Sequence, residues 1–184
     1  WRPTTLNWHF IQHVVFGSYQ EIQQDKIRLA VNVINSKPNE KFIAFVWDKN
    51  TGRALTSILQ DRGIQCDFHN ADVDFERRSE IITRFENDDD PLRVIVATTT
   101  LAYGCNTSAQ NVVIVGVNRG MNEVDELDVI QAGGRAGRFG KSPDGHCFLI
   151  CDHPEQWETR IQNPRPVTST LLSEDALSFH ICAE

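Results

Sequence analysis

The stretch RVIVATTTLAYGCNTSAQNVVIVGV (93–117) holds two short apolar runs, RVIVATT (93–99) and NVVIVGV (111–117), separated by a more polar segment. Each run is rich in β-branched residues and almost continuously apolar, which is typical of a strand buried on both faces. Three further runs have the same character, KFIAFVW (41–47), QCDFH (65–69) and HCFLIC (146–151). The sequence therefore predicts a sheet with a buried centre.

Segments with helical spacing lie between these runs. One follows Thr51, which we expect to cap it, another follows Asp74, and residues 19–37 form an amphipathic stretch before the first strong run. Alternating strands and helices predict right-handed βαβ units, hence an α/β fold with a mostly parallel sheet flanked by helices. Ligands of such sheets sit beyond the carboxyl ends of the strands, so functional residues are expected to follow the strands.

Composition limits the classes of function. The chain has 184 residues, of which 40% are hydrophobic and 23% charged, as in one globular domain. A net charge of -7 argues against a surface that binds nucleic acid everywhere, but leaves room for a small local site. The five cysteines contain no CxxC pair, which favours reduced thiols over a disulfide framework or a zinc site, and no metal ligands are assigned.

The sequence also supports expectations about the cellular location of the protein and about whether it is part of a longer chain. The sequence has no long apolar run and no secretory leader, so we expect no membrane association and a cytoplasmic or nuclear protein. The chain starts at Trp1 and ends within LLSEDALSFHICAE, whose apolar spacing resembles an interrupted helix. We therefore expect a monomeric piece of a larger protein.

The run VIQAGGRAGRFGKS (129–142) ends in Gly-Lys-Ser, as a phosphate-binding loop does. That loop also requires a glycine five residues before Gly140, where this chain has Arg135, whose side chain prevents the backbone from approaching phosphate closely. The acidic DELD (125–128) resembles a magnesium-binding box, but it follows no buried strand and precedes the glycine run. A complete nucleotide site is therefore not expected on this chain.

Arg135 and Arg138 remain. They lie three residues apart on a glycine-rich backbone, and two guanidinium groups at this spacing can converge on one phosphate in a helix or turn. An arginine-rich surface turn paired with acidic neighbours has the same spacing, so the spacing alone leaves both interpretations open.

The order of motifs resembles a known family. Gln131, Gly134, Arg135, Gly137 and Arg138 fit the Q-x-x-G-R-x-G-R motif of the second RecA-like lobe of superfamily 2 helicases. Upstream, 94–109 resembles the motif in which a threonine after a buried strand is followed by Gly-x-Asn, here Thr98, Gly104 and Asn106. The GRAGR sequence and the flanks resemble the DExH branch of archaeal DNA-repair, exosome-associated and spliceosomal helicases.

The resemblance implies roles for these residues. ATP with Mg²⁺ would lie between two lobes, held mainly by a first RecA-like lobe that this chain lacks. Arg135 and Arg138 would act as catalytic arginines and Gln131 would orient water or link the lobes, although a helix-surface glutamine is the plain alternative. Gly104 and Asn106, with both arginines, would face the nucleotide.

The nucleic-acid partner would be single-stranded DNA or RNA. Thr98 and Thr99 would contact its backbone at the strand end, unless the hydroxyl of Thr98 only satisfies local backbone groups. His69 and Asn70, after another strand, are weaker candidates for backbone contacts, and Asn70 fits a capping role equally well.

Residues 1–18 are expected to hold the inter-lobe linker and first strand, 19–162 the RecA-like domain, and 163–184 a linker and the start of a winged-helix-like domain. Two departures from the family pattern are Ser108, where proline is usual, and the short segment NRGMNEVDELD (118–128), where DNA-repair members have a long hairpin. The parent is expected to be an ATP-dependent helicase, and the isolated fragment inactive. The alternative is a non-catalytic nucleic-acid-binding or protein-interaction module derived from a helicase lobe.

Overall fold

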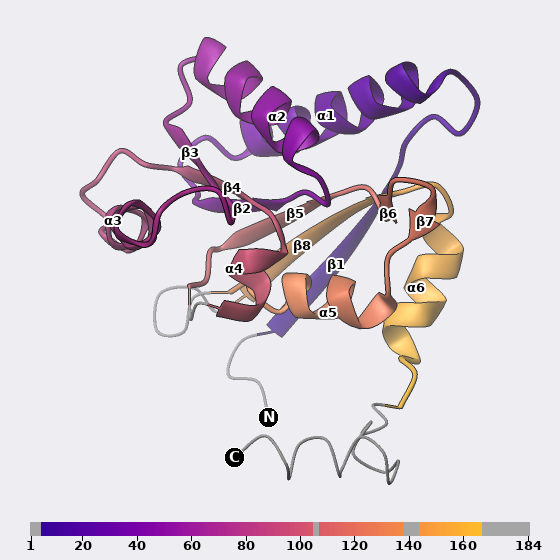
Figure 1. Cartoon of the computed structure of the whole chain (residues 1–184). Coiled ribbons are helices and arrows are strands. Elements are labelled where there is room, and N and C mark those ends of the chain that lie inside the picture. The colour runs from indigo at the N-terminus through magenta and orange to yellow at the C-terminus, as the bar shows by residue number, and fades with distance from the viewer. Residues whose placement is uncertain (1–4, 105–106, 138–143, 167–184) are drawn as a thin grey trace, which may run out of the picture.

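The computed structural model describes residues 5–104, 107–137 and 144–166. Six parallel strands form one sheet in the order β1-β8-β5-β2-β4-β3. Their bounds are β1 Thr5–Gln12, β2 Phe42–Phe45, β3 Cys66–His69, β4 Val94–Ala97, β5 Asn111–Val115 and β8 Asp144–Cys151. The α/β prediction and the five expected strands are confirmed, while β1 at the edge of the sheet has only exposed and half-buried residues and no continuous apolar run (Figure 1).

Helices cover both faces of the sheet. α1 (Tyr19–Ser36) and α2 (Lys49–Asp61) lie on one face (Figure 1). The opposite face carries α3 (Phe75–Glu86), α4 (Thr99–Gly104), α5 (Glu126–Gly133) and α6 (Pro154–Gln162). Alternate residues of each central strand point to opposite faces, so that Phe42 packs under α1 and Ile43 joins the other core.

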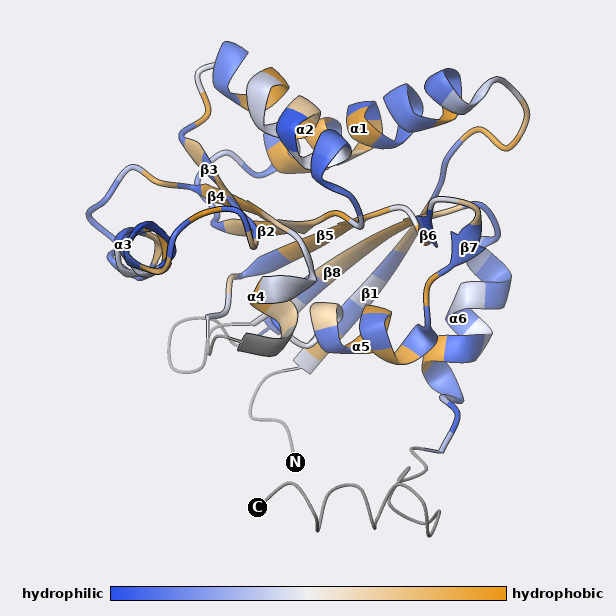
Figure 2. Ribbon diagram, in the orientation of Figure 1, coloured by the Kyte–Doolittle hydropathy of each residue, from blue (hydrophilic) through white to orange (hydrophobic). Residues whose placement is uncertain are grey.

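Two layers of apolar side chains hold the helices to the sheet. Figure 2 shows hydrophobic colour concentrated in the central strands and hydrophilic colour on the outer surfaces of the helices. Phe85 of α3, Leu101 of α4 and Trp157 of α6 are almost completely buried on one face. Because each of these large side chains removes apolar area from water, the sheet and its helices are expected to unfold together.

Helix starts follow capping chemistry. Ser18 and Glu21 form a capping box at α1, and the Asp74 carboxylate accepts a hydrogen bond from the Arg77 amide at 2.8 Å, as expected for a cap of α3. The expected cap Thr51 is wrong. Asp48 is the extended residue directly before α2, and its carboxylate caps the helix by accepting from the Thr51 amide at 2.8 Å, because Thr51 itself already lies in the first turn.

The segment between β5 and α5 is a short antiparallel hairpin of β6 (Asn118–Arg119) and β7 (Asn122–Glu123). Gly120 at its turn has φ +64°, a backbone conformation that glycine adopts without strain. Met121 beside it is fully exposed. The hairpin thus places one apolar side chain in solvent at its tip.

Candidate nucleotide and nucleic-acid sites

Thr98 lies at the carboxyl edge of the sheet, directly after β4. Its backbone amide donates to the His69 carbonyl at 3.2 Å, which fixes it beside the end of β3. Its hydroxyl is 3.3 Å from the Thr100 hydroxyl, and Thr100 is in turn 3.3 Å from Nδ1 of His69. Thr98, Thr99 and Thr100 are all partly exposed. The edge therefore presents hydroxyl groups of fixed position that can meet a phosphate.

His69 and Asn70 are placed differently from Thr98. His69 is 1% exposed and Asn70 5% exposed, so both side chains lie beneath the edge. The Asn70 side-chain oxygen accepts from the Asp72 amide at 2.9 Å and shapes the turn after β3. The His69 ring contacts the partly exposed Thr100, a residue that sequence reasoning missed although it is the third member of the threonine run.

Burial lowers the pKa of His69, and the nearby positive charge of Arg78 lowers it further. The folded state therefore favours neutral His69. In the unfolded chain a histidine protonates near pH 6.5, so stability from this group is present above that pH and decreases as the pH falls through the lower folded pKa.

His69→Asn is expected to weaken the loss of stability on acidification, because it removes one group that binds a proton more readily when unfolded. The free energy of unfolding would be measured by urea denaturation between about pH 7.5 and pH 5.5. The pKa values of His9 and His13 are also lowered, mainly by burial. The slope of the unfolding free energy against pH should therefore decrease in the variant but not reach zero. Equal slopes for wild type and variant would contradict a buried neutral His69.

Arg135 lies at the other end of the short helix α4. Its Nη2 donates to the carbonyl oxygen of Ala102 at 2.5 Å, and its side chain is partly buried. Thr98 directly precedes α4, Gly104 ends it, and α4 packs against α5. A six-residue helix rises about 9 Å. The helix α4 therefore separates Thr98, the candidate contact to nucleic acid, from the candidate arginine Arg135.

The segment that carries Arg135 does not follow a strand, contrary to the expectation that functional residues do so. It follows α5, and Gly134 is the helix C-cap. The next residue, Ala136, bridges to Ala109, which precedes β5, and the Gly137 amide donates to the Ala109 carbonyl at 2.7 Å. The arginine segment is thereby fixed beside the amino ends of β5 and β8, opposite the edge of Thr98.

The remaining expected site residues divide into two groups. Gln131 lies on α5 with its side chain exposed. The structure does not describe two other expected site residues, Asn106 and Arg138, or the Gly-Lys-Ser end of the glycine run. The proposed start of a further domain, in residues 167–184, and residues 1–4 also lie outside the described residues. Convergence of Arg135 with Arg138 thus stays a prediction.

The acidic DELD run has a local structural role. The Asp125 carboxylate caps α5 by accepting from the Leu127 amide at 2.9 Å. Glu126 is 8% exposed and its Oε1 accepts from the Arg165 backbone amide at 2.7 Å and from Arg165 Nε at 3.1 Å. Arg165 Nη2 also donates to Asp125 at 3.0 Å. These carboxylates hold the chain that leaves α6.

In residues 5–104, 107–137 and 144–166, no group of three or more His, Cys, Asp or Glu side chains is arranged to hold a metal ion. Over the same ranges, none of the helices combines the length and the apolar character needed to cross a membrane.

The sequence is similar to archaeal DNA helicases and to a DNA polymerase. "ATP-dependent DNA helicase Hel308" of Pyrobaculum calidifontis is 33% identical over 143 residues, which are 72% of this chain and 20% of that protein. "DNA polymerase theta" of Drosophila melanogaster is 36% identical over 109 residues, 58% of this chain and 5% of that protein. This chain thus spans about a fifth of the length of the Hel308 relatives it matches.

Solved structures share the fold. The E. coli DEAD-box protein SrmB, in its complex with regulator of ribonuclease activity A, has a TM-score of 0.65 at 18% identity, over 90% of this chain and 88% of that one. The C-terminal part of the Fun30 ATPase domain has a TM-score of 0.59 at 16% identity, over 84% and 50% of the two chains. At such identities the likeness shows the fold, which is RecA-like.

The model of the helicase conserved C-terminal domain matches residues 25–140, from α1 through the glycine run after Arg135. That range includes the threonine motif and α4. Since the match covers more than half of the sequence, this chain belongs to the helicase conserved C-terminal domain family.

Proposed function

We propose that this chain is the C-terminal motor lobe of an ATP-dependent nucleic-acid helicase or translocase. The observation that carries the proposal is the position of α4, with Thr98 directly before it and Arg135 bonded to the carbonyl of Ala102 near its end. The helix α4 thus connects Thr98, the proposed contact to nucleic acid, with Arg135, the proposed contact to the phosphates of ATP. The similarity to ATP-dependent DNA helicases supports the same activity for the parent protein.

ATP is the proposed substrate, and Mg²⁺ would accompany it. We propose that both are held mainly by a first RecA-like lobe, because this chain has no complete phosphate-binding loop. Arg135 would contribute charge to the transferring phosphoryl group, with Arg138 as a second arginine and Gln131 in an orienting role. Gly104 and Asn106 would lie against the nucleotide. The isolated chain would then show no ATPase activity.

A single strand of DNA or RNA is the proposed track. Thr98 would donate its hydroxyl, and Thr99 its hydroxyl or amide, to phosphates of the nucleic acid, and such contacts hold the nucleic acid without distinguishing bases. Buried His69 would act through Thr100 by holding the hydroxyl groups in place, not by touching the strand. The chain after Gln162 would lead into a further domain of the parent.

Thr98→Val tests this function in the parent protein. Valine keeps the size and β-branching of threonine and removes only the hydroxyl, so the fold should persist. A hydrogen bond to a charged group contributes about 1.5 to 3 kcal/mol, so strand affinity should fall by roughly tenfold to a hundredfold. The measurement is a titration of ATPase stimulation with single strands of unrelated sequence at one fixed salt concentration.

Thr83→Val is the matched control, because Thr83 is exposed on α3 and bonds only within its helix, to the Ser79 carbonyl. It should leave the stimulation midpoint unchanged. An unchanged midpoint for Thr98→Val, or a loss confined to one base sequence, would remove Thr98 from the strand site. Unstimulated ATPase of both variants should match wild type.

A further inference from the structure

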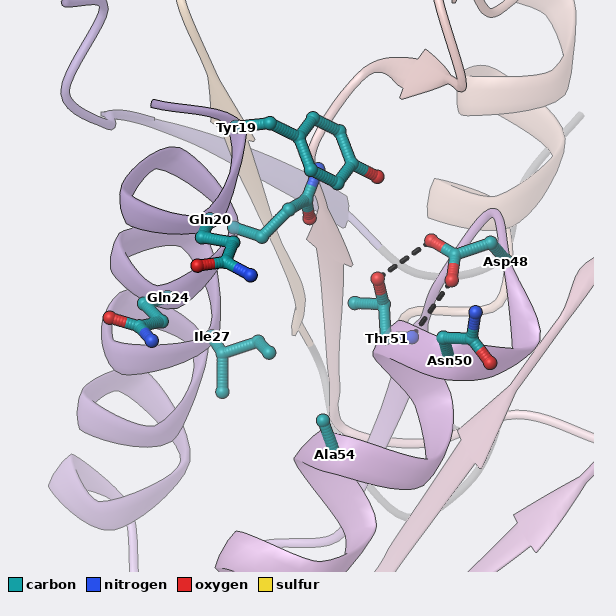
Figure 3. A pocket seen from close by; sticks show the side chains of 9 residues that line it. Tyr19, Gln20, Gln24, Ile27, Asp48, Asn50, Thr51 and Ala54 are labelled. Atoms are coloured by element: carbon teal, nitrogen blue, oxygen red, sulfur yellow. Dashed lines mark hydrogen bonds between the residues drawn. The ribbon is translucent and has the colours of Figure 1, made fainter. Parts of the chain in front are cut away.

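A groove of about 500 Å³ lies between the amino-terminal halves of α1 and α2. Figure 3 shows Tyr19 at its mouth and Ile27 and Ala54 between the two helices, with Asp48 and Thr51 on the α2 side. Its volume is within the range of small-molecule pockets. The groove includes neither the threonines at the carboxyl edge of the sheet (Thr98 to Thr100) nor the segment that carries Arg135, so the function proposed above makes no use of it.

The groove is lined by neutral hydrogen-bonding groups. Gln20, Gln23, Gln24 and Asn50 contribute carboxamides, each of which can donate and accept. Asp48 is the one charged residue among the described lining residues, and its carboxylate accepts from the Thr51 amide at 2.8 Å and the Thr51 hydroxyl at 2.6 Å. Without a lysine or arginine in the lining, the groove is unsuited to a phosphate.

The remaining lining groups suit a flat ligand. Ile27 and Ala54 supply apolar surface within the groove, and Tyr19, which is 64% exposed, supplies a ring at its mouth. A ring for stacking together with carboxamides for edge hydrogen bonds is the chemistry with which proteins bind unstacked nucleobases.

The Asp48 side of the groove lies at the same edge of the sheet as Thr98. Asp48 follows β2, Thr98 follows β4, and these neighbouring strands pair in register with Phe45 opposite Ala97. The Val46 amide donates to the Ala97 carbonyl at 2.9 Å, which holds the two strand ends together. Adjacent β-strands lie about 4.8 Å apart, so Thr98 and the segment that leads to Asp48 leave the sheet side by side.

We propose that this groove binds an unstacked nucleobase of the single strand, with Tyr19 stacking on the base and the carboxamides bonding its edge. The inference rests on the proposed strand contact at Thr98. Thr98 and Thr99 would contact only the nucleic-acid backbone, whereas the groove would add a contact to a base.

The test uses the ¹⁵N-labelled chain and two oligonucleotides of equal length, one with bases and one entirely abasic. Both should shift the amide signals of Thr98 and Thr99. Only the strand with bases should shift the side-chain amide signals of Gln20, Gln24 and Asn50. Shifts of these side chains by the abasic strand as well, or by neither strand while Thr98 responds, would overturn the base pocket and leave the proposed function standing.

Tyr19→Ala is expected to weaken binding of the base-bearing strand by about fivefold to a hundredfold and to leave abasic-strand binding unchanged. Phe16→Ala is the matched control, because Phe16 is a 93% exposed aromatic on the preceding loop and does not line the groove. Equal effects of the two variants would overturn the assignment of Tyr19.

Free adenosine separates failure of the pocket from failure of the proposed function. If neither strand shifts Thr98, the strand contact at Thr98 is wrong. In that case shifts of the groove side chains by adenosine would still support a base pocket, and their absence would overturn it.

Discussion

Arg135→Ala in the two-lobe parent protein is expected to lower kcat for ATP hydrolysis by about a thousandfold or more, the range seen for arginines that stabilise a transferring phosphoryl group. Positioned guanidinium charge acts mainly on the transition state, so kcat should fall much more than nucleotide affinity. Steady-state ATPase kinetics and equilibrium nucleotide binding of the same variant provide the comparison.

Two controls separate chemistry from structure. Arg135→Ala also leaves the Ala102 carbonyl without its donor, so the free energy of unfolding must be measured beside activity. Arg53→Ala removes an arginine that is 60% exposed on α2, and it should leave kcat near the wild-type value. If Arg135→Ala weakened nucleotide binding as much as turnover, the arginine would have a structural role in place of a catalytic one.

Gly145→Ala is expected to destabilise the fold by about 1 to 3 kcal/mol, as overpacking does in a rigid interior. A Cβ at this position would lie 2.5 Å from the backbone carbon of Ala136 and 2.5 Å from the Gly137 nitrogen. Both atoms belong to backbone that is hydrogen-bonded to Ala109, so neither can rotate away.

Urea unfolding of the chain measures this effect, with His146→Ala as the control because His146 is the next residue of β8 and is only partly buried. The control should lose less stability. The clash also displaces the segment that carries Arg135, so Gly145→Ala should reduce ATPase activity in the parent. Wild-type stability for Gly145→Ala would show that β8 and the arginine segment are further apart than the structure has them.

The central strands could be predicted because burial on both faces requires continuous apolar runs, as in Val94–Ala97 and in residues 112–115 of β5. Edge strand β1 could not be found this way. It has one neighbour, β8, and its sequence TLNWHFIQ mixes exposed and half-buried positions. The start of α2 was misplaced because Asp48 and Thr51 are both good cap residues, and their side-chain chemistry alone does not distinguish them.

The sequence predicted which residues belong to the candidate site, but it did not predict how the fold arranges them in space. The motif order indicated Thr98 and Arg135, yet nothing in their spacing showed that α4 places them at opposite edges of the sheet. The burial of His69 and its link through Thr100 depend on how β3 and β4 pair, which is a tertiary property. The groove beside Tyr19 likewise forms only when α1 and α2 come together.

The pairing of β1 with β8 bears on how this domain can be produced. The helicase family match ends at residue 140, so a protein trimmed to 25–140 lacks β1, β8 and α6. Its β5, whose residues Asn111 to Val115 are all buried in the intact sheet, becomes an unprotected edge. Such an edge is a template for pairing with strands of other molecules, whereas boundaries from Thr5 to Gln162 keep β5 paired with β8 and β8 paired with β1.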